Sequence, residues 1–212
     1  MPTDPRLLTL AQWLSPAYPV GAFAYSHGLE TAITDGAVTD KASLQDWITD
    51  ILQHGGGYND ALFLAAAYHA DDPLPINATA RAFAASRERV LETETQGAAF
   101  AEITRNVWAI DLPTLCYPVA VGRAARLTDL PLTDTTALFL QAFVGTLASV
   151  GQRLIPIGQT DAQRLVHSLA PLCVQLAANT QDGDLDRLSS TAFLSDIAAM
   201  RHETQSTRIF RT

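Results

Sequence analysis

The chain has 212 residues and a formal net charge of −8, with 48% hydrophobic and only 17% charged residues. This length suits a single domain with a substantial core, whereas an acidic chain with one lysine, Lys41, lacks the basic surface that nucleic-acid phosphates require. The charged share is below the usual quarter, which leaves apolar surface that association of subunits could cover.

The sequence also indicates a location in the cytoplasm. Residues 1–5 place no basic segment before an apolar run, so we expect no signal peptide. The most apolar window, residues 137–150, is too short to cross a bilayer. Cys116 and Cys173 lack any CxxC-type spacing and are interpreted as reduced core residues. We therefore expect a cytoplasmic protein that contacts neither membrane nor nucleic acid.

The first helix is predicted to begin at Asp4-Pro5, an N-cap followed by proline, and to end at Ser15-Pro16. Residues 15–30 then contain two prolines and two glycines, which exclude a continuous helix, and three aromatic residues that need a surface to lie on. This loop either packs over the chain's own core or faces a partner. A helix is expected to resume near Ser26 and to end near Gly36.

The middle of the chain shows helical spacing of apolar residues throughout. Residues 40–54 give the clearest amphipathic pattern, and Gly55-Gly56-Gly57 ends it. Asn59 or Asp60 is predicted to cap the next helix, and Asn77 a short one that ends at Phe83. A longer helix is expected at about 86–110, with apolar positions at Val90, Leu91, Ile103 and Val107 and a weak point at Gly97.

Three further helices are predicted in the second half. One covers residues 116–127, and one covers 133–154, which is apolar nearly all round and so is expected to be central or to form a dimer interface. The third starts with a capping box, Thr160 to Gln163, and carries a kink at Pro171. No stretch alternates as a strand. The sequence predicts an all-α fold, a single domain over residues 1–212 with about ten helices.

The C-terminus departs from the polar, frayed end of most chains. Phe193, Ile197 and Met200 would share one face of a helix that runs to about Gln205. After it, Arg208-Ile209-Phe210-Arg211 puts two large apolar side chains between arginines. This tail, residues 204–212, either folds back and packs Ile209 and Phe210 on the core, or orders on a partner through its arginines and aromatic side chain.

Motifs for catalysis and metal binding are missing. Gly55-Gly56-Gly57 is followed by Tyr58, so this stretch does not match a phosphate-binding loop. Ser26 and His27 are adjacent in sequence, so on a helix their side chains would point in different directions and would not form a catalytic pair. None of the five histidines pairs with another histidine or a cysteine at helical metal-site spacing. His202 beside Glu203 is interpreted as an exposed polar edge or an interface contact. We expect no enzymatic activity, cofactor or metal site.

Three stretches, residues 14–30, 155–163 and 196–211, resemble the urease accessory protein UreF in order and spacing. The chain departs from the family pattern at Tyr18, Ala162 and Ser206, where an apolar residue, a glycine and a tyrosine are usual. The resemblance implies an all-helical, non-enzymatic homodimer that binds a UreD- or UreH-type scaffold protein. Together these recruit the UreG GTPase and load nickel into apo-urease.

The same resemblance implies that the loop and the tail contact partners, with Phe23 and Arg208 at positions that the family uses. The complete predicted set of partner-binding residues is Phe23, Tyr25, His27, Glu30, Arg201, His202, Glu203, Arg208 and Phe210. A related function would be to modulate GTP hydrolysis by UreG. An arginine supplied by a partner protein can act in this way, but the sequence does not single out one arginine for it. The alternative class is an all-α enzyme with a small-molecule site between helices, which would need titratable residues that converge on a pocket.

Overall fold

The computed structural model describes residues 4–211, and they form helices without any β-strand, which confirms the all-α prediction. Short helices α1 (Pro5–Trp13) and α2 (Leu29–Thr34) flank the loop, which contains the 3-10 turn η1 (Ala22–Ala24). The remaining helices are α3 (Lys41–His54), α4 (Gly56–His69), α5 (Leu74–Phe83), α6 (Arg87–Trp108), α7 (Tyr117–Leu127), α8 (Leu132–Leu154), α9 (Gln159–Asn179) and α10 (Phe193–His202), with a 3-10 turn η2 (Leu185–Arg187) before the last one.

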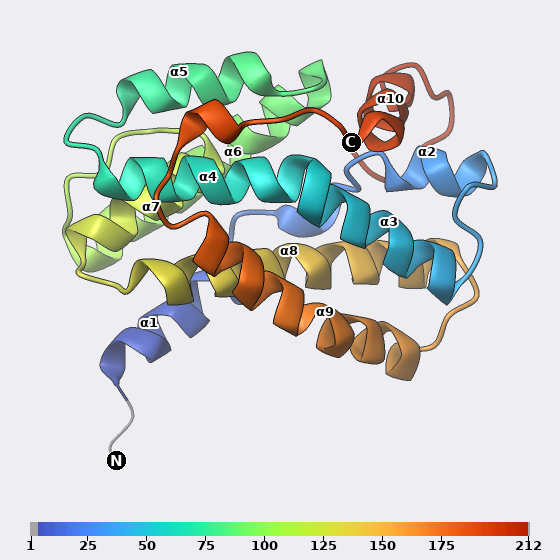
Figure 1. The fold of residues 1–212 in the computed structure, drawn as a ribbon, viewed down its shortest axis with the longest axis horizontal. Coiled ribbons are helices and arrows are strands. Elements are labelled where there is room, and N and C mark those ends of the chain that lie inside the picture. The colour runs from blue at the N-terminus through green and yellow to red at the C-terminus, as the bar shows by residue number, and fades with distance from the viewer. Residues whose placement is uncertain (1–3, 212) are drawn as a thin grey trace.

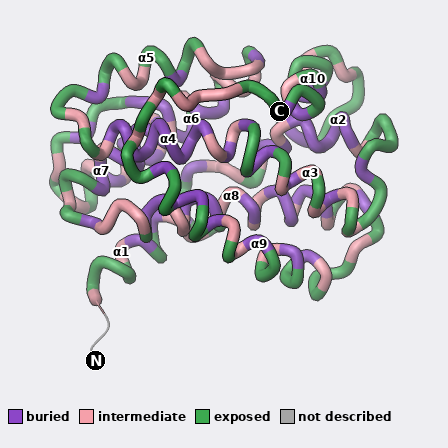
Figure 2. The backbone as a smooth tube through the Cα atoms, in the orientation of Figure 1, coloured by how far each residue is buried: buried purple, intermediate pink, exposed green. Residues whose placement is uncertain are grey.

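Helix α8 is the centre of the fold, as its apolar sequence predicts. It packs along α9 and also contacts α1, η1, α2, α3, α4 and α7. Figure 1 shows α3 and α4 running above α8 and α9, with α5 to α7 at one end and α2 with α10 at the other. The buried stretches in Figure 2 follow the inner faces of these helices. A single apolar cluster extends from Leu10 in α1 to Phe210 in the tail.

Several helix starts follow from their capping residues. Asp4 accepts a hydrogen bond from the Arg6 backbone N–H at 3.0 Å, and Asp40 forms a capping box with Ser43 at the start of α3. Three predicted caps are wrong. Asn59 and Asp60 lie inside α4, which begins at Gly56. Asn77 lies inside α5, where its side chain accepts from the Cys116 N–H at 2.6 Å.

The third incorrect cap is at α9, which starts after Gly158 with no side-chain cap, so the Thr160 capping box does not form. Pro171 lies inside that helix, and a kink there stays a prediction. Cys116 and Cys173 are free and buried, as expected.

Helix α6 differs most from its sequence interpretation. Leu91 and Val107, two of its predicted apolar positions, are exposed, and the buried face carries Glu92, Thr93 and Gln96 together with Phe100 and Ala101. Gly97 is a packing site and does not interrupt the helix, because a Cβ at this position would lie 1.9 Å from the Leu115 carbonyl oxygen. The first part of the buried face of α6 is therefore polar, which apolar periodicity does not detect.

Candidate functional site

The C-terminal tail folds back over the loop and α2. The Arg211 N–H donates to the Ala24 carbonyl at 2.8 Å, which ties the end of the chain to the loop. The Thr31 hydroxyl of α2 donates to the Gln205 side-chain oxygen at 3.0 Å. The loop and the tail, which lie at opposite ends of the sequence, therefore form one structure.

Glu30, in the first turn of α2, holds the tail by its backbone. Its side chain is 5% exposed, and the two carboxylate oxygens accept the N–H groups of Ile209 at 2.7 Å and Phe210 at 2.9 Å. The second oxygen also lies 3.1 Å from Nε2 of His202. Hydrogen bonds to a charged acceptor are about twice as strong as neutral ones. One buried carboxylate thus fixes both the tail and the end of α10.

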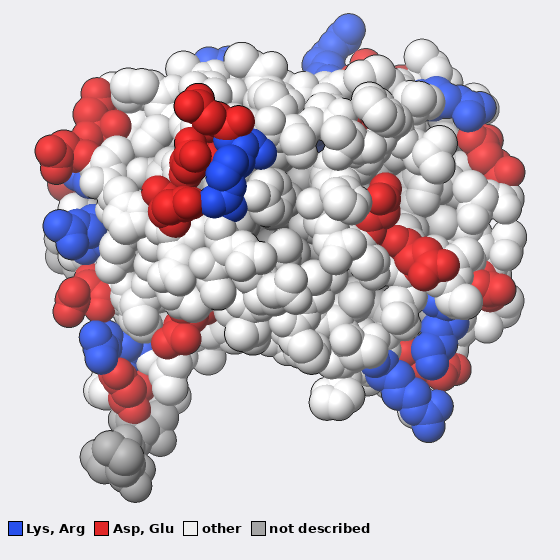
Figure 3. Space-filling view, viewed as in Figure 1, with Lys and Arg blue, Asp and Glu red and all other residues white. Residues whose placement is uncertain are grey.

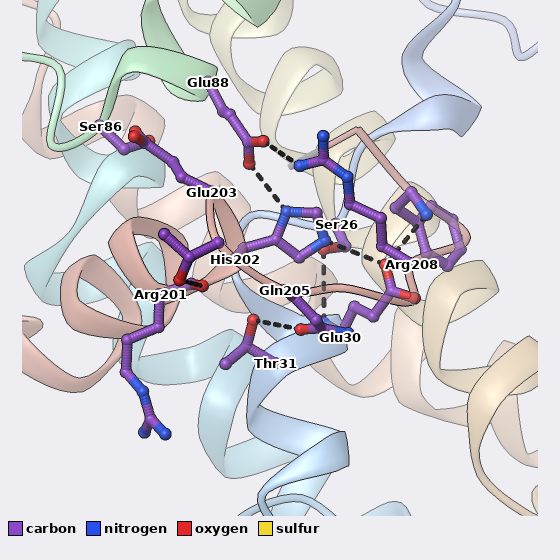
Figure 4. A network of polar contacts seen from close by, with 12 residues as sticks. Ser26, Glu30, Thr31, Ser86, Glu88, Arg201, His202, Glu203, Gln205 and Arg208 are labelled. Carbon is purple, nitrogen blue, oxygen red and sulfur yellow. Dashed lines mark hydrogen bonds and ion pairs between the residues drawn. The ribbon is translucent and has the colours of Figure 1, made fainter.

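His202 connects this carboxylate to a second one. Its side chain is fully buried, and Nδ1 lies 2.8 Å from Glu88 in the first turn of α6. Arg208 of the tail also pairs with Glu88 (Figure 4). We call Glu30, Glu88, His202 and Arg208 the tail cluster. It joins α2, α6, α10 and the tail.

A close helix contact brings these groups together. Gly28, which precedes α2, has φ of +77°, a region that favours glycine. A Cβ at Gly28 would lie 2.7 Å from the Ala199 nitrogen and 2.9 Å from the Ser195 carbonyl oxygen, so α10 can approach α2 only because this residue has no side chain. The Gly28-Leu29-Glu30 sequence therefore sets both the helix contact and the position of the carboxylate.

The side chains of the tail divide between core and surface. Phe210 is 3% exposed, and its ring lies 5.7 Å from the guanidinium carbon of Arg153, a cation–π arrangement. Ile209 beside it is 70% exposed, and in the loop Phe23 is 67% exposed while Tyr25 is buried. The tail does pack on its own core, as one of the two alternatives predicts, but only through Phe210.

Other predicted site residues lie at the edges of this structure. Arg201 points to the surface and pairs with Asp35 at 2.7 Å, and Glu203 accepts the Arg87 backbone N–H at 2.7 Å. His202 is not the exposed edge that the sequence suggested. Glu88 was missed, because an acidic residue in the first turn of a helix is ordinary and nothing in its spacing connects it with residues 202–208.

Helix α10 turns an apolar face outward. Phe193, Ile197 and Met200 share one face, as predicted, and together with Leu194 they are 50–69% exposed. Its inner face carries the small residues Ser195, Ala198 and Ala199. This distribution is the reverse of what packing on the chain's own core would require. We call the four exposed residues the α10 stripe.

His27 belongs to a different group of charges. Its Nε2 lies 3.0 Å from Glu92, and Arg89 pairs with Asp60 at 2.6 Å and with Glu92 at 3.3 Å. We call His27, Asp60, Arg89 and Glu92 the inner cluster. Burial alone would raise the pKa of Glu92, but the charges of His27 and Arg89 outweigh it and lower the pKa to about 2. Burial raises the pKa of Asp60.

The inner cluster borders a cavity of about 510 Å³ between the loop and α8, lined otherwise mainly by apolar residues. Titratable residues therefore do converge on a pocket, which spacing along the chain did not reveal. Within residues 4–211, no group of three or more His, Cys, Asp or Glu side chains is placed to hold a metal ion. None of the helices described has the length and hydropathy needed to span a membrane.

Fold and site together define an all-helical protein that holds its own C-terminal segment through buried polar contacts. The chain matches the family model of UreF over residues 38–170, more than half of its length. It therefore belongs to the UreF family of urease accessory proteins, as its sequence motifs suggested.

Full-length relatives support this assignment. The chain is 55% identical over 214 residues to the urease accessory protein UreF of Ruegeria pomeroyi, with 100% of this chain and 99% of the relative covered. It is 52% identical to the protein of the same name from Roseobacter denitrificans, with 100% and 96% covered. For that of Rhodopseudomonas palustris strain BisB5 the identity is 45%, with 97% and 91% covered.

Proposed function

We propose that this protein acts in the maturation of urease as a non-enzymatic, cytoplasmic homodimer. In this role it binds a UreD- or UreH-type scaffold protein, and the complex recruits a UreG-type GTPase that delivers nickel to apo-urease. Membership of the UreF family and the naming of the relatives as accessory proteins support this role. The single structural observation that carries the proposal is the docked tail. Buried polar side chains of the tail cluster hold its backbone, and the tail exposes other side chains on the surface.

The partner-facing surface in this proposal has three parts. Ile209 is the apolar residue that the docked tail leaves outside, and Arg208 beside it is 41% exposed. Phe23 projects from the loop, to which the tail is bonded through Ala24. The α10 stripe is the third part. Exposed aromatic, aliphatic and arginine side chains of this kind are typical of the energetically dominant residues of interfaces.

The buried members of the predicted set would act on a partner indirectly. Tyr25, Glu30, His202 and Phe210 are each less than 5% exposed, so in this conformation they position the surface and do not form it. His27 would hold the loop through Glu92 in the same way. Arg201 and Glu203 would lie at the rim of the proposed partner-facing surface.

Homodimer formation would use uncharged surface. On the face drawn in Figure 3 charged side chains form small groups, and most of the area is uncharged. A surface of low charge density is what association of two copies would cover. Light scattering at micromolar concentration checks this part, and a monomer would contradict it.

The binding proposal is tested with Arg208→Ala and Ile209→Ser in the full chain, measured against a purified UreD-type protein by calorimetry. Loss of an interface residue of this kind costs roughly 2 kcal/mol or more, which is about a 30-fold loss of affinity. Val174→Ser, which removes an apolar side chain from α9 that is 58% exposed, is the matched control for Ile209→Ser. Normal affinity in both tail variants would contradict the proposal.

The alternative of an all-α enzyme has one observation in its favour, the inner cluster beside the 510 Å³ cavity. The polar groups of this cluster already pair with one another, which is the arrangement of a structural ion network. A screen of the purified protein for hydrolysis of GTP and of small esters and amides tests this alternative. Turnover that is lost in Glu92→Gln, which keeps the side-chain shape, would establish it.

A further inference from the structure

Three segments that meet at the docked tail contain no acidic residue, although the whole chain has a net charge of −8. They are residues 15–27 of the loop, residues 135–154 of α8 and residues 204–211 of the tail. None of the three contains an aspartate or a glutamate, and together they carry the arginines Arg153, Arg208 and Arg211. Positive charge is therefore concentrated on one part of an acidic protein, where it can steer an anionic partner.

Three contacts join these segments into one surface. The guanidinium carbon of Arg153, in the last turn of α8, lies 5.7 Å from the centre of the Phe210 ring. The backbone N–H of Arg211 donates to the Ala24 carbonyl at 2.8 Å, next to Phe23. Phe23 and Arg153 both line the cavity of about 510 Å³. We call the exposed residues of this surface the arginine patch: Phe23, Arg153, Arg208, Ile209 and Arg211.

The charges of the arginine patch are accessible. Arg153 and Arg211 are exposed, and within residues 4–211 neither guanidinium pairs with a carboxylate. Arg208 pairs with Glu88 and is 41% exposed. The patch thus presents two guanidinium groups without a partner charge and a third that is partly compensated.

The carboxylates nearby are covered or engaged. Glu30 and Glu88 are 5% and 13% exposed, and both lie against the buried His202 ring. Glu203, just after α10, accepts the Arg87 backbone N–H at 2.7 Å. The exposed charge of the arginine patch is therefore positive.

The apolar members of the patch narrow the kind of partner that fits. Phe23 and Ile209 are 67% and 70% exposed and lie among the arginines, so a phosphate group alone would leave them uncovered. The chain has one lysine and a negative net charge, which does not suit a nucleic acid or an anionic membrane surface. Guanidinium groups bind carboxylates in a two-pronged geometry, and exposed aromatic and aliphatic side chains bind apolar ones.

We propose that the arginine patch binds an acidic segment of the protein that docks on the tail, a segment in which aspartate or glutamate side chains flank apolar ones. Its carboxylates pair with Arg153, Arg208 and Arg211, and its apolar side chains cover Phe23 and Ile209. The identification of that protein as UreD-type rests on the proposed function, whereas the chemistry of the segment does not. Charges at the edge of an interface act mainly on the rate of association.

The test is the association rate of the full-length protein with a purified UreD-type protein, measured by stopped-flow fluorescence at about 50 mM and about 500 mM NaCl. We expect Arg153→Glu and Arg211→Glu each to slow association roughly fivefold at the lower salt concentration. The difference should shrink to about twofold or less at the higher one, because salt screens exposed charges. Arg153→Gln and Arg211→Gln, which remove the charge without reversing it, should give intermediate rates.

Arg126→Glu is the matched control. Arg126 is exposed, ends helix α7 and lies 6.0 Å from the Tyr68 ring, and its reversal changes the net charge by the same amount. Equal slowing by the control and the patch variants would overturn the inference, as would a slowing that does not depend on salt. Arg211→Glu decides if Arg153→Glu loosens the tail through the loss of its contact with Phe210.

A second probe separates the inference from the proposed function. If the UreD-type protein does not bind the wild-type chain, the proposed function fails, and a short peptide of alternating glutamate and leucine then tests the patch. We expect this peptide to shift the backbone amide NMR signals of Phe23 and Ile209 in the wild-type protein but not in Arg211→Glu. No shift would overturn the inference, and so would binding of phosphatidylserine vesicles in place of the peptide. If Ile209→Ser weakens binding of the UreD-type protein while the arginine variants behave like Arg126→Glu, the proposed function stands and the acidic segment is wrong.

Discussion

The two buried charge clusters of this protein differ in the elements that they hold together. The inner cluster links α4 and α6, and its Arg89, Asp60 and Glu92 are at most 16% exposed. The tail cluster holds a terminal segment, and its Arg208 is 41% exposed. The inner cluster is part of the core, whereas the tail cluster closes a segment that can open without unfolding the helices. Similar chemistry therefore supports the fold in one place and the proposed binding surface in the other.

Arg89→Met is the variant that should separate the clusters most strongly. It leaves Asp60 and Glu92 buried without their guanidinium, and breaking a buried ion pair in this way costs roughly 3–5 kcal/mol. For a chain of this length that lowers the melting temperature by about 10 °C. Thermal unfolding followed by circular dichroism measures it, with Arg164→Ala, which removes an exposed pair with Asp161, as the control. Equal melting temperatures would contradict the role of the inner cluster.

Acid should act on the inner cluster through Glu92. Its pKa falls from an ordinary value near 4.5 to about 2 in the folded state, so the carboxylate stabilises the fold above about pH 4.5. That contribution, a few kcal/mol, disappears as the pH falls from about 4.5 to about 2. We expect the difference in unfolding free energy between the wild-type protein and Glu92→Gln to shrink over this range in urea titrations. A difference independent of pH would show that Glu92 is not the group responsible.

The tail cluster should respond to Glu30→Gln by local opening. Loss of the charged acceptor weakens the bonds to Ile209 and Phe210, and a loss of about 1.4 kcal/mol raises the open fraction about tenfold. Limited trypsin digestion at Arg208, followed by mass spectrometry, reports this opening, while the melting temperature should fall by only a few degrees. An unchanged cleavage rate would mean that Glu30 does not hold the tail.

Asp35→Asn provides the smallest expected effect and the control for the previous variant. Its ion pair with Arg201 is 38% and 62% exposed on the two sides, so it contributes at most about 1 kcal/mol. We expect trypsin cleavage at Arg208 and the melting temperature to match the wild-type protein. A large change would move the boundary of the tail cluster to include this pair.

The sequence predicts the helices better than the site. Asp4-Pro5 and the apolar run of α8 act locally, so their patterns indicate a helix start and a central helix directly. Glu88 depends on His202 and Arg208, which lie more than a hundred positions away, and no periodicity encodes such a contact. The loop and the tail were each recognised, but only the structure shows that Arg211 and Ala24 join them.

The tail also shows why its two sequence-based alternatives are not exclusive. Because Phe210 is buried, deletion of residues 204–212 removes a core side chain and should lower stability as well as binding. Such a deletion cannot distinguish a structural tail from a binding tail. Ile209, at 70% exposure, can be changed without opening the core.

The most direct test of the central claim is therefore the affinity of Ile209→Ser for a UreD-type protein, with its melting temperature measured on the same sample. We predict a melting temperature within about 1 °C of the wild-type value, because an exposed side chain is lost, and an affinity lower by about 30-fold or more. An unchanged affinity at an unchanged melting temperature would contradict the account, since the docked tail would then present no binding surface.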